Sequence, residues 1–157
     1  MAKSELTKEL EGLTIRYLRK LGWYSCIEVG LREKIRDVYN EEKMMIEQII
    51  PERPYQIVDV LMYCERDNEF RCYEIKTTVS DFRSKAHKSF IGNYNYYVFP
   101  KGLYEKVKDE IPKEIGVLEA GHGWALKCLK NAKYQELQYP KELLLESMVR
   151  SLYREAY

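Results

Sequence analysis

Histidine and cysteine are scarce in this chain of 157 residues, and neither residue type is clustered. The two histidines, His87 and His122, lie far from each other and near no cysteine, and the four cysteines include no close pair. Zinc sites require Cys and His ligands at short spacings, so this pattern argues against one. Three of the four cysteines fall within expected strands, where a free thiol packs as a small apolar group.

Long apolar runs and excess charge are also missing. No segment approaches the ~20 apolar residues that span a bilayer, and the first residues lack the apolar core of a signal peptide. We therefore expect a cytoplasmic protein with reduced thiols and no membrane association. The formal net charge of +1 gives no overall basic character, so a nucleic-acid surface would need local clusters of Lys and Arg. The length and the lack of repeats or linkers predict one domain over residues 1–157.

The segment 56–76 carries the clearest structural pattern of the chain. Two runs of β-branched and aromatic residues, 56–63 and 70–76, flank the polar cluster Glu65-Arg66-Asp67-Asn68-Glu69. Short runs of this composition separated by a turn cluster predict a β-hairpin.

Three ionisable residues of this hairpin are candidates for chemistry. Side chains alternate between the two faces of a strand, so Glu74 and Lys76 should share one face, with Tyr73 and Ile75 on the other. Asp59 lies inside an apolar run, where an ionised carboxylate is costly unless a positive charge meets it. Two carboxylates and a lysine gathered across one hairpin make a divalent-metal site the leading interpretation.

The remaining patterns predict helices and strands in alternation. Apolar residues at helical spacing predict helices over 4–21, 80–88, 102–111 and 142–155, and β-type runs predict strands over 23–29, 94–99, 115–120 and 124–130. Strands separated by helices favour parallel crossovers, so the expected fold class is α/β, with a mixed central sheet flanked by helices.

Capping residues mark several helix ends. Ser4 can accept a hydrogen bond at the start of the first helix, and Gly22 can end that helix. Ser80 or Asp81 is expected to cap the second helix. The closing helix carries an apolar stripe that would pack on the core or form an interface in a homodimer: Leu143, Leu144, Met148, Leu152 and Tyr153.

The span 31–54 is interpreted as an insertion between strands, a place where specificity loops or lids often occur. Within it, residues 40–50 are predicted to form a helix that Pro51 stops, and residues 32–37 a helical turn or a loop.

Asp59 and the triplet Glu74-Ile75-Lys76 stand on adjacent expected strands, after a helix and a first strand. This arrangement resembles the PD-(D/E)XK nuclease superfamily over an αβββαβ core at residues 9–99. A closer likeness to the MmcB-like DNA-repair branch rests on Lys76-Thr77-Thr78, on Asp81-Phe82-Arg83 and on the later strands and closing helix.

The resemblance implies a restriction-endonuclease-like fold with an extra C-terminal strand and helix. It implies a metal-dependent DNA endonuclease acting in DNA repair, recombination or the processing of phage and mobile-element DNA. Asp59, Glu74 and Ile75 would bind Mg²⁺ or Mn²⁺, and Lys76 would position or activate the attacking water. Glu11 stands where resolvase-like members carry a further carboxylate on the first helix.

These residue types suit the chemistry. Mg²⁺ takes carboxylate oxygens, usually from one or two protein groups, and keeps several waters. A bound metal polarises a phosphoryl oxygen and lowers the pKa of its water, while a nearby lysine stabilises developing negative charge. Without a cation, Asp59 and Glu74 would repel each other, and one of them would tend to protonate.

Several residue roles stay open at this point. Glu11 is either a site acid or an ordinary charge on the helix surface, and Glu28 is better explained by solvent exposure. Asp81 is better explained as a helix cap than as a metal ligand. A basic group could track DNA phosphates or simply face solvent: Arg83, Lys85, His87 and Lys88. The fourteen tyrosines could stack on unpaired bases or pack in the core.

Two other functions compete with the nuclease reading. One is a catalytically inactive nuclease-fold module that binds DNA or a protein partner, which the near-neutral charge favours. The other is a purely structural domain in which Lys76 forms a buried ion pair with Asp59 or Glu74.

Overall fold

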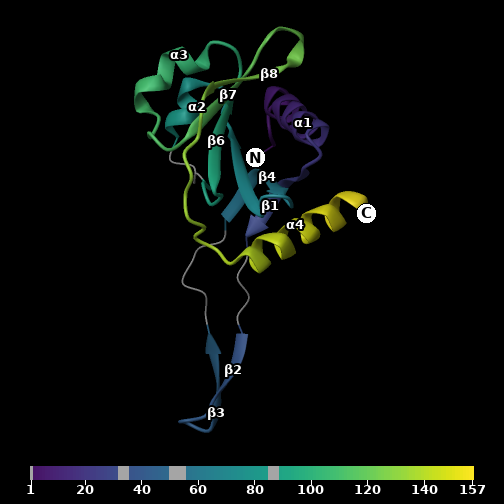
Figure 1. Cartoon of the computed structure of the whole chain (residues 1–157), viewed down its shortest axis with the longest axis vertical. Coiled ribbons are helices and arrows are strands. Elements are labelled where there is room, and N and C mark those ends of the chain that lie inside the picture. Colours follow the sequence, from purple (N-terminus) through teal and green to yellow (C-terminus); the bar gives the residue numbers. More distant parts are fainter. Residues whose placement is uncertain (1, 32–35, 50–55, 85–88) are drawn as a thin grey trace.

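The computed structural model describes residues 2–31, 36–49, 56–84 and 89–157, and its body is a sheet with helices on both faces (Figure 1). The elements of the body, in chain order, are α1 (Glu5–Lys20), β1 (Tyr24–Leu31), β4 (Gln56–Cys64), β5 (Glu69–Ile75), α2 (Val79–Arg83), β6 (Tyr94–Phe99), α3 (Leu103–Val107), η1 (Lys108–Glu110), β7 (Gly116–Ala120), η2 (His122–Trp124), β8 (Leu126–Lys130) and α4 (Lys141–Ala156).

The six strands of this sheet lie in the order β1-β4-β5-β6-β7-β8. The pairs β1–β4, β4–β5 and β7–β8 are antiparallel, whereas β5–β6 and β6–β7 are parallel. The two parallel pairs are those connected through α2 and α3, which confirms the expected mixed α/β sheet. None of the described helices is both long and apolar enough to cross a membrane.

Helix α1 begins and ends where its sequence predicts. The Ser4 side chain accepts a hydrogen bond from the Thr7 backbone N–H at 3.2 Å. Gly22 has a φ of 76°, a left-handed conformation that costs glycine little, and the Trp23 N–H reaches back to the Leu18 carbonyl. The helix therefore ends at Lys20, Leu21 is its C-cap, and Gly22 lets the chain turn into β1.

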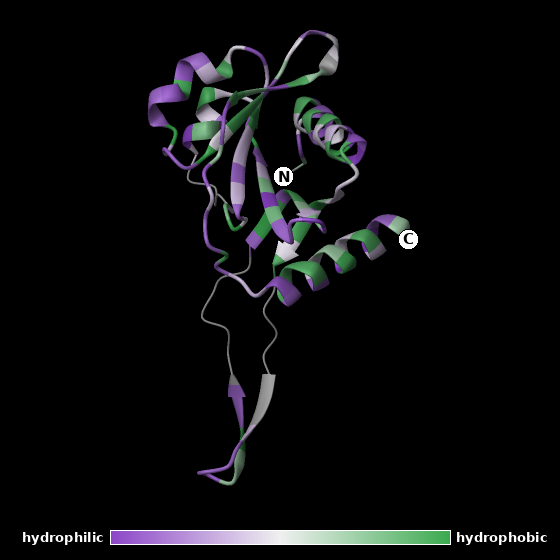
Figure 2. Ribbon diagram, viewed as in Figure 1, coloured by the Kyte–Doolittle hydropathy of each residue, from purple (hydrophilic) through white to green (hydrophobic). Residues whose placement is uncertain are grey.

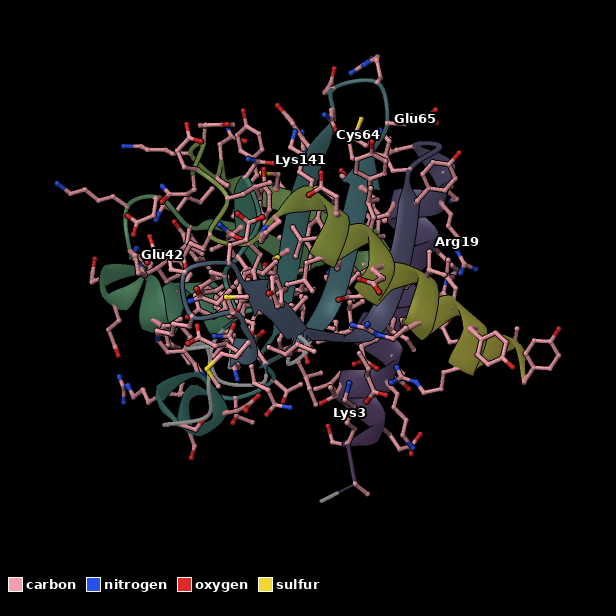
Figure 3. All side chains as sticks on the ribbon, turned by 90° about the horizontal axis from the view of Figure 1, so that it is seen from below. Lys3, Arg19, Glu42, Cys64, Glu65 and Lys141 are labelled. Atoms are coloured by element: carbon pink, nitrogen blue, oxygen red, sulfur yellow. The ribbon has the colours of Figure 1, made fainter. Side chains whose placement is uncertain are left out.

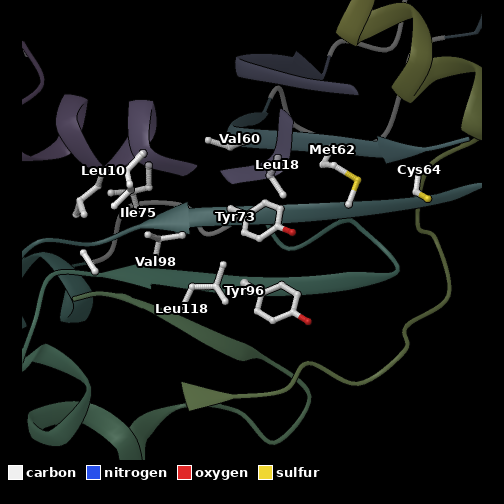
Figure 4. Close-up of a cluster of buried hydrophobic side chains, with 12 residues drawn as sticks. Leu10, Leu18, Val60, Met62, Cys64, Tyr73, Ile75, Tyr96, Val98 and Leu118 are labelled. Carbon is white, nitrogen blue, oxygen red and sulfur yellow. The ribbon is translucent and has the colours of Figure 1, made fainter. Parts of the chain in front are cut away.

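The core has two sides. Figure 4 shows the cluster between α1 and one face of the sheet, where Leu10 and Leu18 of α1 meet residues of the central strands such as Val60 and Val98. On the opposite face, α4 packs Leu144 against the β4–β5 part of the sheet, while α2 and α3 cover β6 and β7. Layers of this kind remove most of the apolar surface of the sheet from water.

Helix α4 also covers the open edge of the sheet at β1. Ser151 Oγ donates to the Ile27 carbonyl at 2.7 Å, and the Arg154 guanidinium donates to the Glu28 carbonyl at 2.9 Å. These bonds occupy backbone acceptors that an edge strand would otherwise offer to another chain.

The predicted apolar stripe of α4 is correct only in its first half. Leu143, Leu144 and Met148 are buried against the sheet, but Leu152 and Tyr153 are exposed. The buried face of the helix continues through Ser147 and Ser151, so Leu152 and Tyr153 lie outside the face that contacts the sheet.

The insertion differs from its prediction. Its described part is not a helix but an antiparallel hairpin of β2 (Arg36–Asn40) and β3 (Met45–Ile49), which extends away from the body (Figures 1 and 2). The Asn40 side chain accepts a hydrogen bond from the Lys43 backbone N–H at 3.1 Å. Asn stabilises turns by such local bonds, and this preference overrides the helical spacing of the apolar residues.

The second helix is shorter than predicted, and a different residue caps it. Thr78, rather than Ser80 or Asp81, is the N-cap, and its side chain accepts from the Asp81 backbone N–H at 3.0 Å. The helix α2 ends at Arg83, and residues 85–88 of the predicted helix lie outside the described residues.

Candidate metal centre

The C-terminal end of β5 places the candidate residues as the strand period predicts. Tyr73 and Ile75 pack into the core under α1, so Glu74 and Lys76 lie on the opposite face. Glu74 and Lys76 are both buried, at 5% exposure each. Burying either charged side chain alone would be energetically costly, so the carboxylate of Glu74 and the ammonium group of Lys76 must interact with opposite charges.

Lys76 lies between two carboxylates. Its Nζ is 3.4 Å from Glu74 Oε1 and 3.9 Å from Asp81 Oδ1. Its backbone N–H donates to the Val98 carbonyl of β6 at 3.1 Å, which fixes the residue just past the end of β5. The ammonium group is thus held in place beside the acids of the site.

Asp59 joins this group from the neighbouring strand. Its Oδ2 accepts a hydrogen bond from the Ile75 backbone N–H at 2.9 Å. Burial raises the pKa of the Asp59 carboxyl, and the hydrogen bond from Ile75 and the charges of Lys3 and Lys76 offset part of that rise. The side chain is half-buried, so its second oxygen remains within reach of solvent or a ligand.

Glu74 is the most perturbed acid of the site. Burial, followed by the negative charge of Asp59, raises the pKa of its carboxyl to about 7, although Lys76 acts in the opposite direction. One of its oxygens, Oε2, is buried and has no hydrogen-bond partner among the described residues. A buried carboxylate oxygen without a donor is unstable unless a proton or a cation meets it.

Glu11 is brought to the same region, but through a partner that sequence reasoning missed. Its carboxylate, only 8% exposed, forms an ion pair with Lys3, and Lys3 Nζ also lies 3.0 Å from Glu28 Oε1. Burial raises the pKa of Glu11, and Lys3 lowers it. Glu28 is half-exposed, in line with the sequence interpretation, and it also forms an ion pair with Lys3.

The position of Glu28 could have been found from the hairpin register. Its flanking residues Ile27 and Val29 pair with Val60 and Val58, so Glu28 lies opposite Asp59. Glu28 also has a φ of 48°, an uncommon conformation for a residue other than glycine. Nothing in the sequence indicated Lys3, because its contacts depend on how the segment before α1 approaches β1.

Asp81 serves the helix cap and the site at once. Its Oδ2 accepts the Thr77 backbone N–H at 2.9 Å, while Thr78 accepts the Asp81 N–H, an arrangement close to a capping box. Its Oδ1 meanwhile faces Lys76. The predicted cap was therefore wrong: Thr78 is the N-cap, and Asp81 lies in the first turn of the helix.

Aromatic residues line the side of the site that faces α2. Tyr97 pairs with Glu74 in the β5–β6 register, and its ring lies 5.2 Å from that of Phe82. Burial and then the charge of Glu74 raise the pKa of the Tyr97 hydroxyl. This apolar wall keeps water from one side of the Glu74 carboxylate.

Of the predicted DNA-binding residues, Arg83 is the one that lies within the described part of the chain. Arg83 forms a two-pronged ion pair with Glu110, with N–O distances from 2.6 to 3.2 Å. Lys85 and Lys88 lie outside the described residues. Most of the tyrosines of β5 and β6 are buried, which favours core packing over base stacking for them.

The donor set fits a hard divalent cation that keeps waters, rather than a fully protein-ligated metal. Among the residues that the structure describes, no three His, Cys, Asp or Glu side chains form a ready metal-binding group. Two carboxylates, Asp59 and Glu74, with one buried oxygen lacking a donor, are the usual protein share of a Mg²⁺ site.

No protein-family model and no curated protein matches the chain. A solved structure with a similar fold is SPO1766, a protein of unknown function from Silicibacter pomeroyi. The two share 18% sequence identity with a TM-score of 0.65, over 99% of this chain and 91% of that one. A likeness at this identity concerns the fold alone.

Proposed function

We propose that the protein is a metal-dependent DNA endonuclease that hydrolyses phosphodiester bonds in DNA repair, recombination or mobile-element DNA processing. The observation that carries the proposal is the buried Glu74 carboxylate: Oε1 faces Lys76, and Oε2 has no hydrogen-bond donor among the described residues. A divalent cation shared with Asp59 would satisfy that oxygen and relieve the repulsion between the two acids.

Asp59, Glu74 and Ile75 would hold Mg²⁺ or Mn²⁺, with waters in the remaining positions. When bound, the metal would polarise a phosphoryl oxygen and supply a water of lowered pKa. The Lys76 ammonium, held by Glu74 and Asp81, would orient the attacking water and offset the negative charge that develops on the phosphate. Glu11 would be an additional acid of the site on the α1 side, paired with Lys3.

The element order supports the resemblance on which the nuclease assignment rests. The sequence α1-β1-β4-β5-α2-β6 follows the αβββαβ order expected of a restriction-endonuclease-like core, and β8 and α4 supply the extra C-terminal strand and helix. The PD-(D/E)XK membership and the likeness to MmcB-like proteins remain part of this proposal.

The test is cleavage of plasmid, single-stranded and branched DNA with Mg²⁺ or Mn²⁺. We expect metal-dependent products from the wild type and a loss of about 10²–10³-fold in Lys76→Met, since that change removes one preorganised charge. Lys127→Met, at an exposed position of β8, is the matched control and should cut normally. If neither the wild type nor Lys76→Met cleaves any of these substrates, the proposal that the protein is a nuclease is wrong.

A nuclease-fold module that binds DNA or a protein without cutting is the second candidate. It is favoured by the near-neutral net charge and by the pairing of Arg83 with Glu110. This candidate predicts DNA or partner binding that changes neither with metal nor with Glu74→Gln.

Thermal melts separate a purely structural Glu74–Lys76 ion pair from the proposed metal site. Mn²⁺ should raise the melting temperature of a protein with a metal site by mass action, and should leave one with a structural ion pair unchanged.

A further inference from the structure

Lys3 reaches the candidate site from the opposite side to Lys76. It precedes the first turn of α1, where Figure 3 labels it, and its ammonium group contacts both Glu11 and Glu28. Its side chain is 28% exposed, so the ammonium is neither free in solvent nor sealed in the core.

The acids that Lys3 contacts belong to the same charge cluster as the metal ligands. Glu28 lies opposite Asp59 across the β1–β4 pair. Lys3 thus links Glu11 of α1 to Glu28 of β1, and the β1–β4 register places Glu28 beside Asp59 of β4.

The cluster as a whole has two halves, each with one lysine. On the β5 half, Lys76 faces Glu74, whose second oxygen is buried without a donor. On the α1–β1 half, Lys3 lies between Glu11 and Glu28. Only the β5 half thus has a buried carboxylate oxygen that still lacks a partner among the described residues.

We propose that Lys3 is an intramolecular cation that fills the α1–β1 half of the acid cluster and restricts the site to one divalent metal, held by Asp59 and Glu74. The inference rests on the metal site proposed above and adds what limits its metal count. A second divalent ion on the α1 side would have to displace an ammonium group already bonded to two carboxylates.

The role differs from that of Lys76. Lys76 is held by the backbone of β5 and β6, so it stays beside the reacting groups. Lys3 belongs to the short segment before α1, so its ammonium group is held by its ion pairs with Glu11 and Glu28 rather than by the hydrogen bonds of a strand. Either the Lys3 ammonium group or a divalent metal ion can neutralise the negative charges of Glu11 and Glu28.

The test is the number of Mn²⁺ ions bound per chain, measured by titration calorimetry and by electron paramagnetic resonance of free Mn²⁺. The variants are Lys3→Met, which removes the charge, and Lys3→Arg, which keeps it. Lys8→Met is the matched control, because Lys8 is an exposed lysine of α1 whose ion-pair partner is Glu5.

We expect one Mn²⁺ in the wild type, in Lys3→Arg and in Lys8→Met, and a second in Lys3→Met that binds at least tenfold more tightly than any second ion in the wild type. The double variant Lys3→Met with Glu28→Gln should return to one ion, since it lacks an oxygen ligand of the vacated half. Glu28 is half-exposed, so this change should not disturb folding.

The outcomes separate this inference from the proposed function. One Mn²⁺ in both wild type and Lys3→Met, with equal affinity, overturns the role of Lys3 and leaves the metal site standing. No Mn²⁺ in any variant overturns the metal site and this inference with it. A melt gives an independent readout: Mn²⁺ should raise the melting temperature of Lys3→Met by more degrees than that of the wild type.

Discussion

Two antiparallel hairpins, β4–β5 and β2–β3, make a natural comparison within this molecule. In β4–β5 most of the apolar side chains, such as Val60 and Phe70, are buried between helices on both faces, although Ile57 near the start of β4 is exposed. In β2–β3 the apolar side chains that the structure describes are exposed, with Met45 at 52% and Ile46 at 65%. The two have the same backbone pairing and opposite surroundings.

Strand pairing alone therefore determines neither the stability of a hairpin nor the pKa values of its side chains. A two-stranded hairpin in water is marginal, because cross-strand bonds replace bonds to water at little net gain. Burial stabilises β4–β5, and it also raises the pKa of Glu74. In β3, the partly exposed Glu47 accepts a hydrogen bond from Lys43, which lowers the pKa of its carboxyl. A glutamate paired with a lysine thus has a raised pKa in the buried hairpin and a lowered pKa in the exposed one.

The largest difference between the two hairpins is expected when Glu74 of β5 and Glu47 of β3, each paired with a lysine, are replaced in turn. Glu74→Gln should lower metal-dependent DNA cleavage by about 10²–10³-fold, because it removes a metal ligand. Glu47→Gln, which also removes a strand glutamate paired with a lysine, should cut like the wild type. Equal effects of the two changes, measured as initial cleavage rates, would break the distinction between the hairpins.

Core packing supplies the second test. Phe70→Ala in β5 should cost about 3–5 kcal/mol in the free energy of unfolding, because it empties a fully buried site. Ile46→Ala in β3 should change it by less than about 0.5 kcal/mol, since that side chain is already in water. Urea unfolding of both variants measures the contrast, and a large cost at Ile46 would show that the exposed hairpin is packed on something.

The pH dependence of stability is the third test. The folded-state pKa of Glu74 is raised from 4.5 to about 7, so the native state holds its proton more tightly than the unfolded chain. The contribution of Glu74 to the free energy of unfolding is therefore fully present below pH 4.5 and is lost as the pH rises to about 7. Glu11 and Asp59 shift in the same direction.

Melting temperatures of the wild type in a chelator should therefore fall from pH 5 to about pH 7, in the window set by Glu74. The fall should be shallower in Glu74→Gln, which cannot titrate at that position. Added Mn²⁺ should stabilise the wild type more at high pH than at low pH, because the metal binds the ionised carboxylate. A melting temperature that is flat with pH would contradict the raised pKa.

The smallest expected effect concerns the exposed hairpin as a whole. Replacing residues 36–49 with a short Gly-Ser linker should change the free energy of unfolding by less than about 0.5 kcal/mol, because loop length alone costs little. The measurement is urea unfolding against the full chain. A large loss would mean that β2–β3 contributes to the body after all.

Much of the body could be predicted from local patterns. The turn cluster between β4 and β5, the period-two placement of Glu74 and Lys76, and the Gly22 helix end each depend on short-range chemistry. The hairpin β2–β3 was missed because its apolar residues also fit a helical spacing, and propensity cannot choose when no packing surface is given. Burial, which depends on neighbours distant in sequence, decided which half of the α4 stripe packs.

The sequence by itself determined the two strands that carry Asp59, Glu74 and Lys76 and the face that the last two share, since strand geometry fixes alternation. Only the tertiary structure decided what meets those groups. Glu28 lies opposite Asp59 through register, Lys3 reaches Glu11 because the segment before α1 folds back on β1, and Glu74 Oε2 is sealed by its neighbours. Charge and burial act through space, and a linear sequence does not state which residues will be close.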